Sequence, residues 1–277
     1  MAVTTGRPFL NPRVKQLPFY FYNLATMLQV VIIGSGNVAQ HLIKAFANNA
    51  NAKIVQAFAR HPQDLEHLLP ATAITSSYDT ITEADVYIIA VKDDAIAHVS
   101  SQLPFTGRLV LHTSGSSGLE HLDNKNWRGV FYPLQTFSKN KEIDFSIVPL
   151  CLESEQESDY QTLENLAKGL SKSIYSIDSE QRKALHVAAV FVSNFTNHMY
   201  TIGGEICSQN NIPFSILRPL IRETADKINT LSPKEAQTGP AIRHDRQTIQ
   251  KHLDFLEKEN HKELYTLITQ SIQQTNE

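Results

Sequence analysis

The 277-residue chain is poor in cysteine, and Cys151 and Cys207 are its only two. Two cysteines so far apart in sequence exclude the disulfide framework of a small secreted domain. Both lie in apolar surroundings, so we expect small buried side chains in a reducing compartment. His186 and Asn194 have helical spacing, but no acidic or cysteine ligands accompany them. The sequence therefore predicts no metal site.

The chain also lacks a long apolar run and an excess of charge of either sign. No segment reaches the roughly 18 apolar residues of a membrane helix, and the longest candidate, 184–192, is interrupted by His186. A formal net charge of −3 provides no field that would attract nucleic acid or an anionic membrane. With 42% hydrophobic and 19% charged residues, the sequence is typical of a globular protein with room for two domains.

Residues 1–26 lack the pattern of a secretory signal. Pro18 and Asn23 interrupt any apolar core, and no small-residue cleavage site precedes the first predicted strand. We expect these residues to be a disordered extension, with Met27 as the functional start, and the protein to be cytoplasmic.

What the chain does contain is a glycine turn in the stretch 28–46, LQVVIIGSGNVAQHLIKAF. An apolar run predicts a buried parallel strand before the turn, and a helical pattern follows it. Gly34 permits the sharp turn, Gly36 lets the backbone approach a pyrophosphate, and Ala39 allows close packing of helix on strand. Free N–H groups at the start of the helix favour phosphates. The predicted dinucleotide-binding residues here are Gly34, Ser35, Gly36, Asn37 and Val38.

The second predicted strand, 53–60, ends in Arg60 and His61, where NAD-binding sites usually place an acidic residue. An arginine at this place can pair with a 2′-phosphate and stack on adenine, which favours NADP(H) as the cofactor. The alternative is a solvated arginine at the end of a strand.

Strands and helices alternate up to about residue 178. This pattern predicts an α/β fold, a doubly wound and mainly parallel Rossmann sheet over 27–178, followed by an all-helical domain over 179–277. The carboxyl ends of parallel strands line the ligand crevice. We therefore add to the cofactor-binding set the residues that follow predicted strands, Val91, Lys92, His112 and Ser114, and we add Gln135 as substrate-binding. Asp93 lies near the cofactor or caps a helix.

The first helix of the second domain, predicted over 180–209, carries a polar stripe. At about 100° per residue, His186, Ser193 and Asn197 share one side, with Lys183 and Asn194 on its flank. Apolar residues cover most of the remaining circumference, so we expect a helix buried nearly all round. The stripe forms a network between helices or faces the nicotinamide end of the crevice.

A reductase of a ketone or imine needs a proton source near neutral pH. His186 is the first candidate, with His112 and Lys183 behind it. Asn194 and Asn197 can orient a carbonyl or carboxylate. The predicted catalytic residues are His186, Asn194, Asn197 and Lys183.

The loop 232–245 precedes the predicted helix 248–260 and is rich in turn residues and side-chain donors. Arg243 can clamp a substrate carboxylate, with Thr238 and the backbone of Gly239 as further donors. Alternatively, Arg243 pairs with Asp245 and fixes the loop.

Six segments carry a resemblance to known proteins: VVIIGSGNVAQHL, AVKDDAI, VLHTSGS, FYPLQTFS, RKALHVAAVFVSNFTNHMY and SPKEAQTGPAIRHD. The chain resembles bacterial Rossmann-like proteins with a C-terminal helical domain of unknown function. These proteins are relatives of pyrroline-5-carboxylate reductase and of the deazaflavin-dependent NADP oxidoreductases. The pattern usually has histidine before Pro-Leu-Gln, where this chain has Tyr132. The Lys-x-x-x-Asn pair of ketopantoate reductases is also missing, since Val190 stands four residues before Asn194.

The resemblance implies an NADP-linked oxidoreductase fold, an active site between the domains and a homodimer formed through the helical domain. The expected function is NADP(H)-dependent reduction of a small 2-keto or imino acid, with a ketopantoate-like substrate as one such acid. The alternative is a catalytically inactive NADP-binding sensor or scaffold protein.

Overall fold

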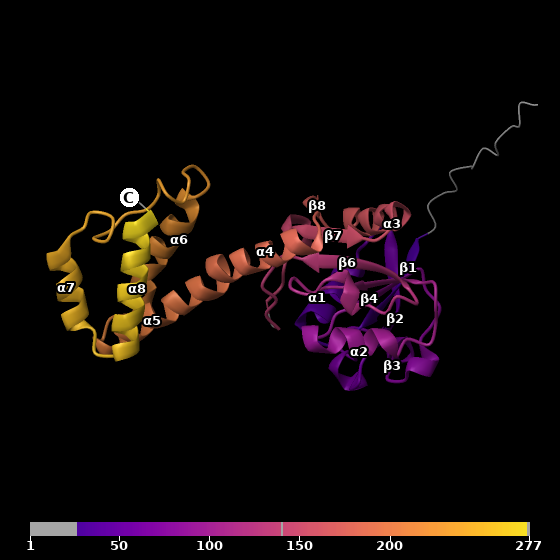
Figure 1. The fold of residues 1–277 in the computed structure, drawn as a ribbon. Coiled ribbons are helices and arrows are strands. Elements are labelled where there is room, and N and C mark those ends of the chain that lie inside the picture. The colour runs from indigo at the N-terminus through magenta and orange to yellow at the C-terminus, as the bar shows by residue number, and fades with distance from the viewer. Residues whose placement is uncertain (1–26, 140, 276–277) are drawn as a thin grey trace, which may run out of the picture. The chain divides into compact units, whose positions relative to one another are not determined.

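The structure is a computed structural model that describes residues 27–139 and 141–275 (Figure 1). The predicted disordered extension, residues 1–26, lies outside the described residues. The chain divides into two compact units, the first ending at Val187 and the second beginning at Ala188. The first unit contains an eight-stranded sheet and the second contains helices, so the predicted fold class is confirmed.

The strands of the first unit follow the order β3-β2-β1-β4-β5-β6-β7-β8. Neighbouring strands are parallel except for the antiparallel pair β6 and β7. The strands are β1 (Leu28–Ile33), β2 (Ala52–Phe58), β3 (Ile74–Thr75), β4 (Val86–Ile89), β5 (Leu109–His112), β6 (Trp127–Pro133), β7 (Leu150–Ser154) and β8 (Ile174–Ser176). The α-helices that begin in this unit are α1 (Asn37–Phe46), α2 (Ile96–Ser101), α3 (Glu157–Lys168) and α4 (Ser179–Ala189).

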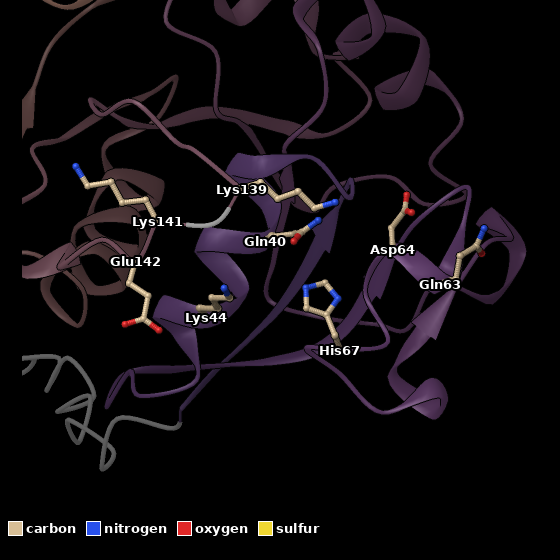
Figure 2. Close-up of a pocket in the computed structure, with 8 residues that line it drawn as sticks. All are labelled: Gln40, Lys44, Gln63, Asp64, His67, Lys139, Lys141 and Glu142. Carbon is tan, nitrogen blue, oxygen red and sulfur yellow. The ribbon is translucent and has the colours of Figure 1, made fainter. Parts of the chain in front are cut away.

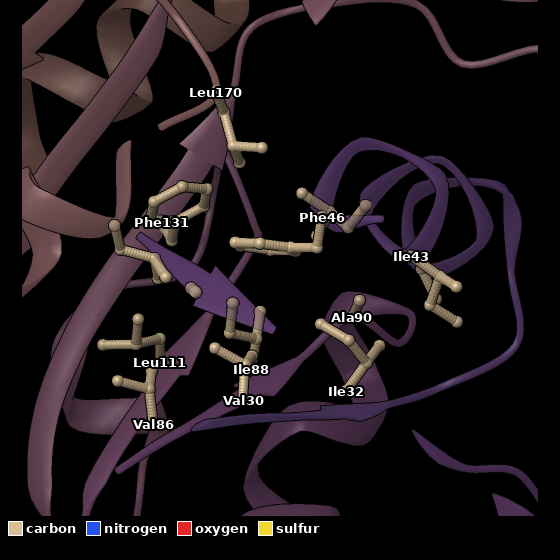
Figure 3. Packing of buried hydrophobic residues seen from close by; sticks show 14 of the residues in the cluster. Val30, Ile32, Ile43, Phe46, Val86, Ile88, Ala90, Leu111, Phe131 and Leu170 are labelled. Atoms are coloured by element: carbon tan, nitrogen blue, oxygen red, sulfur yellow. The ribbon is translucent and has the colours of Figure 1, made fainter. Parts of the chain in front are cut away.

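The apolar run of β1 is buried on both faces of the sheet, as the pattern predicted. Val30 and Ile32 join the core under α1 and α3, whereas Val31 and Ile33 join the core under α2. Figure 3 shows the first of these cores, in which Phe46 of α1 packs with residues of β1 and β4. Two-sided burial fixes the register of β1 and thereby the position of the glycine turn at its end.

The second unit contains α5 (Thr196–Gln209), α6 (Arg218–Lys227), α7 (Arg246–Phe255) and α8 (Glu259–Thr275). Between α4 and α5, residues Val190–Phe195 form a π-helix. The helix predicted over 180–209 is therefore present as one continuous helical run, but its middle segment is a π-helix and not a regular α-helix. A π-helical segment advances by a smaller angle per residue, so the alignment of His186 with Asn197 calculated for a regular α-helix does not apply.

Apolar side chains of the second unit are mostly exposed. Of its described hydrophobic residues, only Cys207 and Ala241 are buried. Phe191, Val192 and Phe195 are 62%, 75% and 50% exposed, so the expectation that these residues bury the helix nearly all round is wrong for the single chain. Among the described residues, no helix combines the length and hydropathy that crossing a bilayer requires.

Candidate functional site

The glycine turn connects β1 to α1 in a conformation that only glycine adopts easily. Gly34 has a φ of 135°, and a Cβ atom there would lie 2.2 Å from the Ala90 carbonyl oxygen. Gly36 differs, because nothing lies within 4 Å of the position that its Cβ would occupy. The start of α1 has no side-chain cap and no acidic residue in its first turn. These features fit a phosphate held by the backbone N–H groups of the turn.

Side chains around the turn have protein partners. The Ser35 hydroxyl donates to Asp64 Oδ2 at 3.1 Å, and Asn37 Nδ2 donates to the Phe137 carbonyl at 2.9 Å. Val38 is half-buried against the core. The predicted phosphate site is thus built chiefly from backbone, and these side chains hold its shape.

Three other predicted cofactor-binding residues lie just beyond strand ends. Arg60 is exposed and lies two residues past the end of β2. Burial raises the pKa of Tyr78, and the positive charge of Arg60 acts on that pKa in the opposite direction. Val91 is half-buried and Lys92 is exposed after β4. All three follow parallel strands that end at the same edge as β1, so this edge is where a nucleotide would extend from the turn.

His112 is fully buried at the end of β5. Its Nδ1 accepts a hydrogen bond from the Ser114 N–H at 3.1 Å. Burial, and next the charge of Arg182, lowers the pKa of His112 to about 4, so this imidazole is neutral near pH 7. These observations argue against His112 as a proton source or as a side-chain contact of the cofactor.

Ser114 is also occupied within its loop. Its Oγ accepts hydrogen bonds from the N–H groups of Ser116 and Ser117 at 3.1 and 2.9 Å. The Ser116 hydroxyl donates to Asp93, which begins a short 3₁₀-helix for which Lys92 is the N-cap residue. Asp93 therefore does not occupy the capping position that we considered for it, and instead ties the loop after β4 to the loop after β5.

A tyrosine–histidine pair lies at the end of β6. Tyr132 Oη and His186 Nδ1 are 3.1 Å apart, and the His186 side chain is half-buried. A Cβ atom on Gly115 would lie 2.5 Å from His186 Nδ1, so the loop after β5 needs glycine to make room for the pair. Burial raises the pKa of Tyr132 to about 12, which keeps the phenol protonated near neutral pH. The sequence identified His186 as a candidate proton source but did not identify Tyr132 as its partner.

Arg182 anchors the helix that carries His186. It is fully buried, with one guanidinium nitrogen bonded to Glu153 of β7 and another to the Ser117 carbonyl. Glu153 also accepts hydrogen bonds from the backbone N–H and the hydroxyl of Ser179 at 3.0 and 2.9 Å. The start of α4 is therefore fixed to the sheet one turn before His186. Sequence reasoning did not single out either ionic partner.

Two other predicted residues of the first unit have surface partners. Lys183 forms an ion pair with Glu180 at 2.8 Å, and this hydrogen bond raises the pKa of the lysine. Its side chain is partly exposed and stays charged near neutral pH, which argues against a role as proton source. Gln135 is exposed, and its Oε1 accepts from the Thr136 N–H at 2.8 Å.

The remaining predicted residues belong to the second unit, and all but Gly239 are exposed. Asn194 lies within the π-helix, a conformation found frequently at functional sites, and Asn197 lies in the first turn of α5. Gly239, with a φ of 108°, shares one loop with Thr238 and Arg243. Asp245 is the N-cap of α7 and accepts from the Thr248 N–H at 3.1 Å. Within the described residues Arg243 and Asp245 form no ion pair.

Two family models match the chain. Residues 29–114 match the coenzyme F420-dependent NADP oxidoreductase family, and residues 148–272 match a domain of unknown function (DUF2520). No curated protein sequence matches the chain. Among the described residues, no group of three or more His, Cys, Asp or Glu side chains is arranged to hold a metal ion.

Solved structures extend the likeness over most of the chain. The crystal structure of a putative NADP oxidoreductase from Bacteroides fragilis is 39% identical, with 89% of this chain and 98% of that chain covered and a TM-score of 0.79. A protein from Thermotoga maritima is 20% identical over 89% of this chain and 98% of its own, with a TM-score of 0.69. An imine reductase variant from Myxococcus stipitatus in complex with NAD⁺ is 16% identical over 90% and 94%, with a TM-score of 0.59.

The fold and the glycine turn together define a pyridine-nucleotide-binding protein of the oxidoreductase class. More specifically, the chain belongs to the NADP oxidoreductase family in which an F420-dependent-type nucleotide domain precedes a DUF2520 domain.

Proposed function

We propose that this protein is an NADP(H)-dependent reductase of a small 2-keto or imino acid, a class that includes ketopantoate-like substrates. The observation that carries the proposal is the pairing of Tyr132 with His186 at the same sheet edge as the glycine turn. Among the solved structures of similar fold is an imine reductase, which supports a carbonyl or imine as the reacting group.

Reduced nicotinamide, when bound, supplies a hydride to the carbonyl or imine carbon. The chain must then deliver a proton to the oxygen or nitrogen. With its proton on Nδ1, His186 donates to Tyr132 Oη and leaves the phenol proton free for the substrate. The same hydrogen bond stabilises the phenolate that forms, which offsets the high pKa of the buried phenol. In the second unit, exposed Arg243 is the proposed clamp for the substrate carboxylate, with Thr238, Gly239, Asn194 and Asn197 as further donors.

Turnover of NADPH with a panel of 2-keto acids and cyclic imines tests this proposal. Tyr132→Phe and His186→Ala should each lower kcat by roughly 10²–10⁴-fold, the contribution of a positioned acid, with little change in NADPH affinity. Tyr175→Phe is the matched control, because Tyr175 lies exposed on β8. A protein that binds NADPH but oxidises it with no member of the panel would instead favour the sensor or scaffold.

Arg60 is the proposed determinant of NADP(H) over NAD(H). Arg60→Ala should weaken NADPH binding by roughly 1–3 kcal/mol, the scale of a lost charge-assisted contact, and leave NADH binding unchanged. Isothermal titration calorimetry measures the affinity for each nucleotide. Arg108→Ala is the control, because Arg108 pairs with Glu83 and lies neither in the glycine turn nor at the end of β2. Equal losses for the two nucleotides would refute the role of Arg60.

The helical unit is the proposed homodimer interface. Eleven of the sixteen large hydrophobic side chains that the described residues expose lie in this unit, whereas its buried hydrophobic residues are only Cys207 and Ala241. Exposed apolar side chains that gather in one unit are typical of a surface that associates with another chain. Light scattering after size exclusion should show two chains per particle, and Phe191→Glu should shift the particle toward one chain. A wild-type monomer would refute the dimer.

A further inference from the structure

A cavity of about 610 Å³ lies on the outer side of α1 (Figure 2). Three segments line it: α1, the segment 63–67 that follows β2, and the segment after Phe137. The lining residues are Gln40, Lys44, Gln63, Asp64, His67, Lys139, Lys141 and Glu142. None of them was among the residues that the sequence singled out for function.

The charges around this cavity favour an anion. Among the lining residues, three lysines outnumber the two acidic residues. Lys44, Lys139 and Lys141 form no ion pair within the described residues, although Asp64 and Glu142 line the same cavity. Lysines without an ion-pair partner in the lining of one cavity favour the binding of a phosphate.

The cavity is also continuous with the glycine turn. Two of its lining side chains bind Ser35, the middle residue of the turn: Asp64 accepts from the Ser35 hydroxyl at 3.1 Å, and Gln40 Nε2 donates to the Ser35 carbonyl at 2.9 Å. A nucleotide held at the turn would therefore have the cavity next to it. The segment 63–67 also begins three residues after Arg60, the predicted partner of a 2′-phosphate.

We propose that this cavity binds a phosphate dianion and that the 2′-phosphate of NADP(H) is its source. The proposal rests on the proposed preference for NADP(H). Lys44 of α1 and Lys139 of the segment after Phe137 are the proposed phosphate-binding cations of the cavity, in addition to Arg60, which precedes the segment 63–67. Asp64 opposes them, because its carboxylate lies in the same wall and repels a dianion.

Calorimetric titration with NADPH and with NADH tests the proposal without any turnover. Lys44→Ala and Lys139→Ala should each raise the Kd of NADPH roughly tenfold, as expected for a lost hydrogen bond to a charged group, and leave the Kd of NADH unchanged. Asp64→Asn should lower the Kd of NADPH severalfold, since it removes the repulsion and keeps an amide beside Ser35. Lys168→Ala is the matched control, because Lys168 pairs with Glu164 on α3 at 2.7 Å and does not line the cavity.

A second arm identifies the source of the phosphate. Inorganic phosphate should compete with NADPH more strongly than with NADH, and Lys44→Ala should abolish that difference. If phosphate raises the melting temperature of the wild type but not of the lysine variants, while NADPH affinity is unchanged in them, the cavity binds free phosphate and the assigned source is wrong.

Equal weakening of NADPH and NADH binding would overturn the proposal, since the lysines would then support the turn and not recognise a phosphate. NADPH affinities within twofold of wild type, with no effect of phosphate on melting, would overturn it as well. Failure of the proposed reductase function is distinguishable, because a protein without turnover on any keto or imino acid still yields these binding constants.

Discussion

Arg182 offers a direct test of how the position of His186 is maintained. Its side chain is fully buried, whereas that of its partner Glu153 is 14% exposed. Arg182→Met keeps most of the apolar stem but removes the charge and the hydrogen bond to Ser117. It leaves the Glu153 carboxylate without its buried counter-ion, and an uncompensated buried charge is what makes the loss of one partner strongly destabilising.

The expected cost follows from these contacts. Breaking a buried ion pair costs roughly 3–5 kcal/mol, and the remaining exposure of Glu153 favours the lower end, about 3 kcal/mol. Removing both charges leaves no unpaired ion. The double variant Glu153→Met, Arg182→Met should therefore lose only about 1 kcal/mol of unfolding free energy. This is the typical cost of losing a helix cap, here the hydrogen bond from the Ser179 N–H to Glu153.

Urea unfolding followed by tryptophan fluorescence measures both values. Trp127 is the only tryptophan and begins β6, so its signal reports the first unit. Arg128→Met is the matched control, because Arg128 pairs with Glu155 nearer the surface and should cost about 1 kcal/mol or less. A double variant less stable than Arg182→Met would refute the reasoning, as would a cost for Arg182→Met no larger than that of the control.

Two further predictions concern the same edge of the sheet. Gly115→Ala places a Cβ atom 2.5 Å from His186 Nδ1, so it should separate His186 from Tyr132 and lower kcat at least tenfold, while NADPH affinity measured by titration stays unchanged; wild-type turnover would contradict this. The pKa of His112 is lowered from 6.5 to about 4, so the unfolded chain binds the extra proton between these values. The contribution of His112 to the free energy of unfolding should therefore be fully present above pH 6.5 and should fall by roughly 3 kcal/mol as the pH drops to 4. Urea unfolding of His112→Asn at pH 7.5 and 4.5 should not show this pH-dependent loss. An equal loss in that variant would assign the pH dependence to other groups.

The sheet and the glycine turn were predictable because their signals are local. Val30–Ile33 is apolar at every position, which a strand buried on both faces requires, and glycine at 34 and 36 follows it directly. The same run of sequence determines the strand, the turn and the helix. Few long-range contacts were needed to predict these three elements.

The tyrosine–histidine pair was only half predictable because it joins residues 54 positions apart. Periodicity placed His186 on a helix, but no pattern in the sequence indicates that its side chain meets Tyr132. The burial that lowers the pKa of His112 is likewise a property of packing, and it removed a candidate that residue type alone had favoured.

Helical periodicity failed where the helix itself changes. The angular alignment over 180–209 assumed one constant turn, whereas Val190–Phe195 adopts a π-helix. The apolar residues of this region were read as core, but Phe191 and Val192 are exposed in the single chain. Hydrophobicity predicts that a side chain will be covered, and it does not tell whether the cover comes from the same chain.

The two glycines of the turn provide a genetic tool. A side chain at position 34 would collide with the Ala90 carbonyl, so its replacement damages the fold and nucleotide binding together. Position 36 has a φ of −70° that any residue accepts, and open space in the direction of its missing side chain. Gly36→Val should therefore give a folded protein at normal abundance whose phosphate site is blocked. Cells carrying this allele would separate what the protein does with a nucleotide from what its mere presence does.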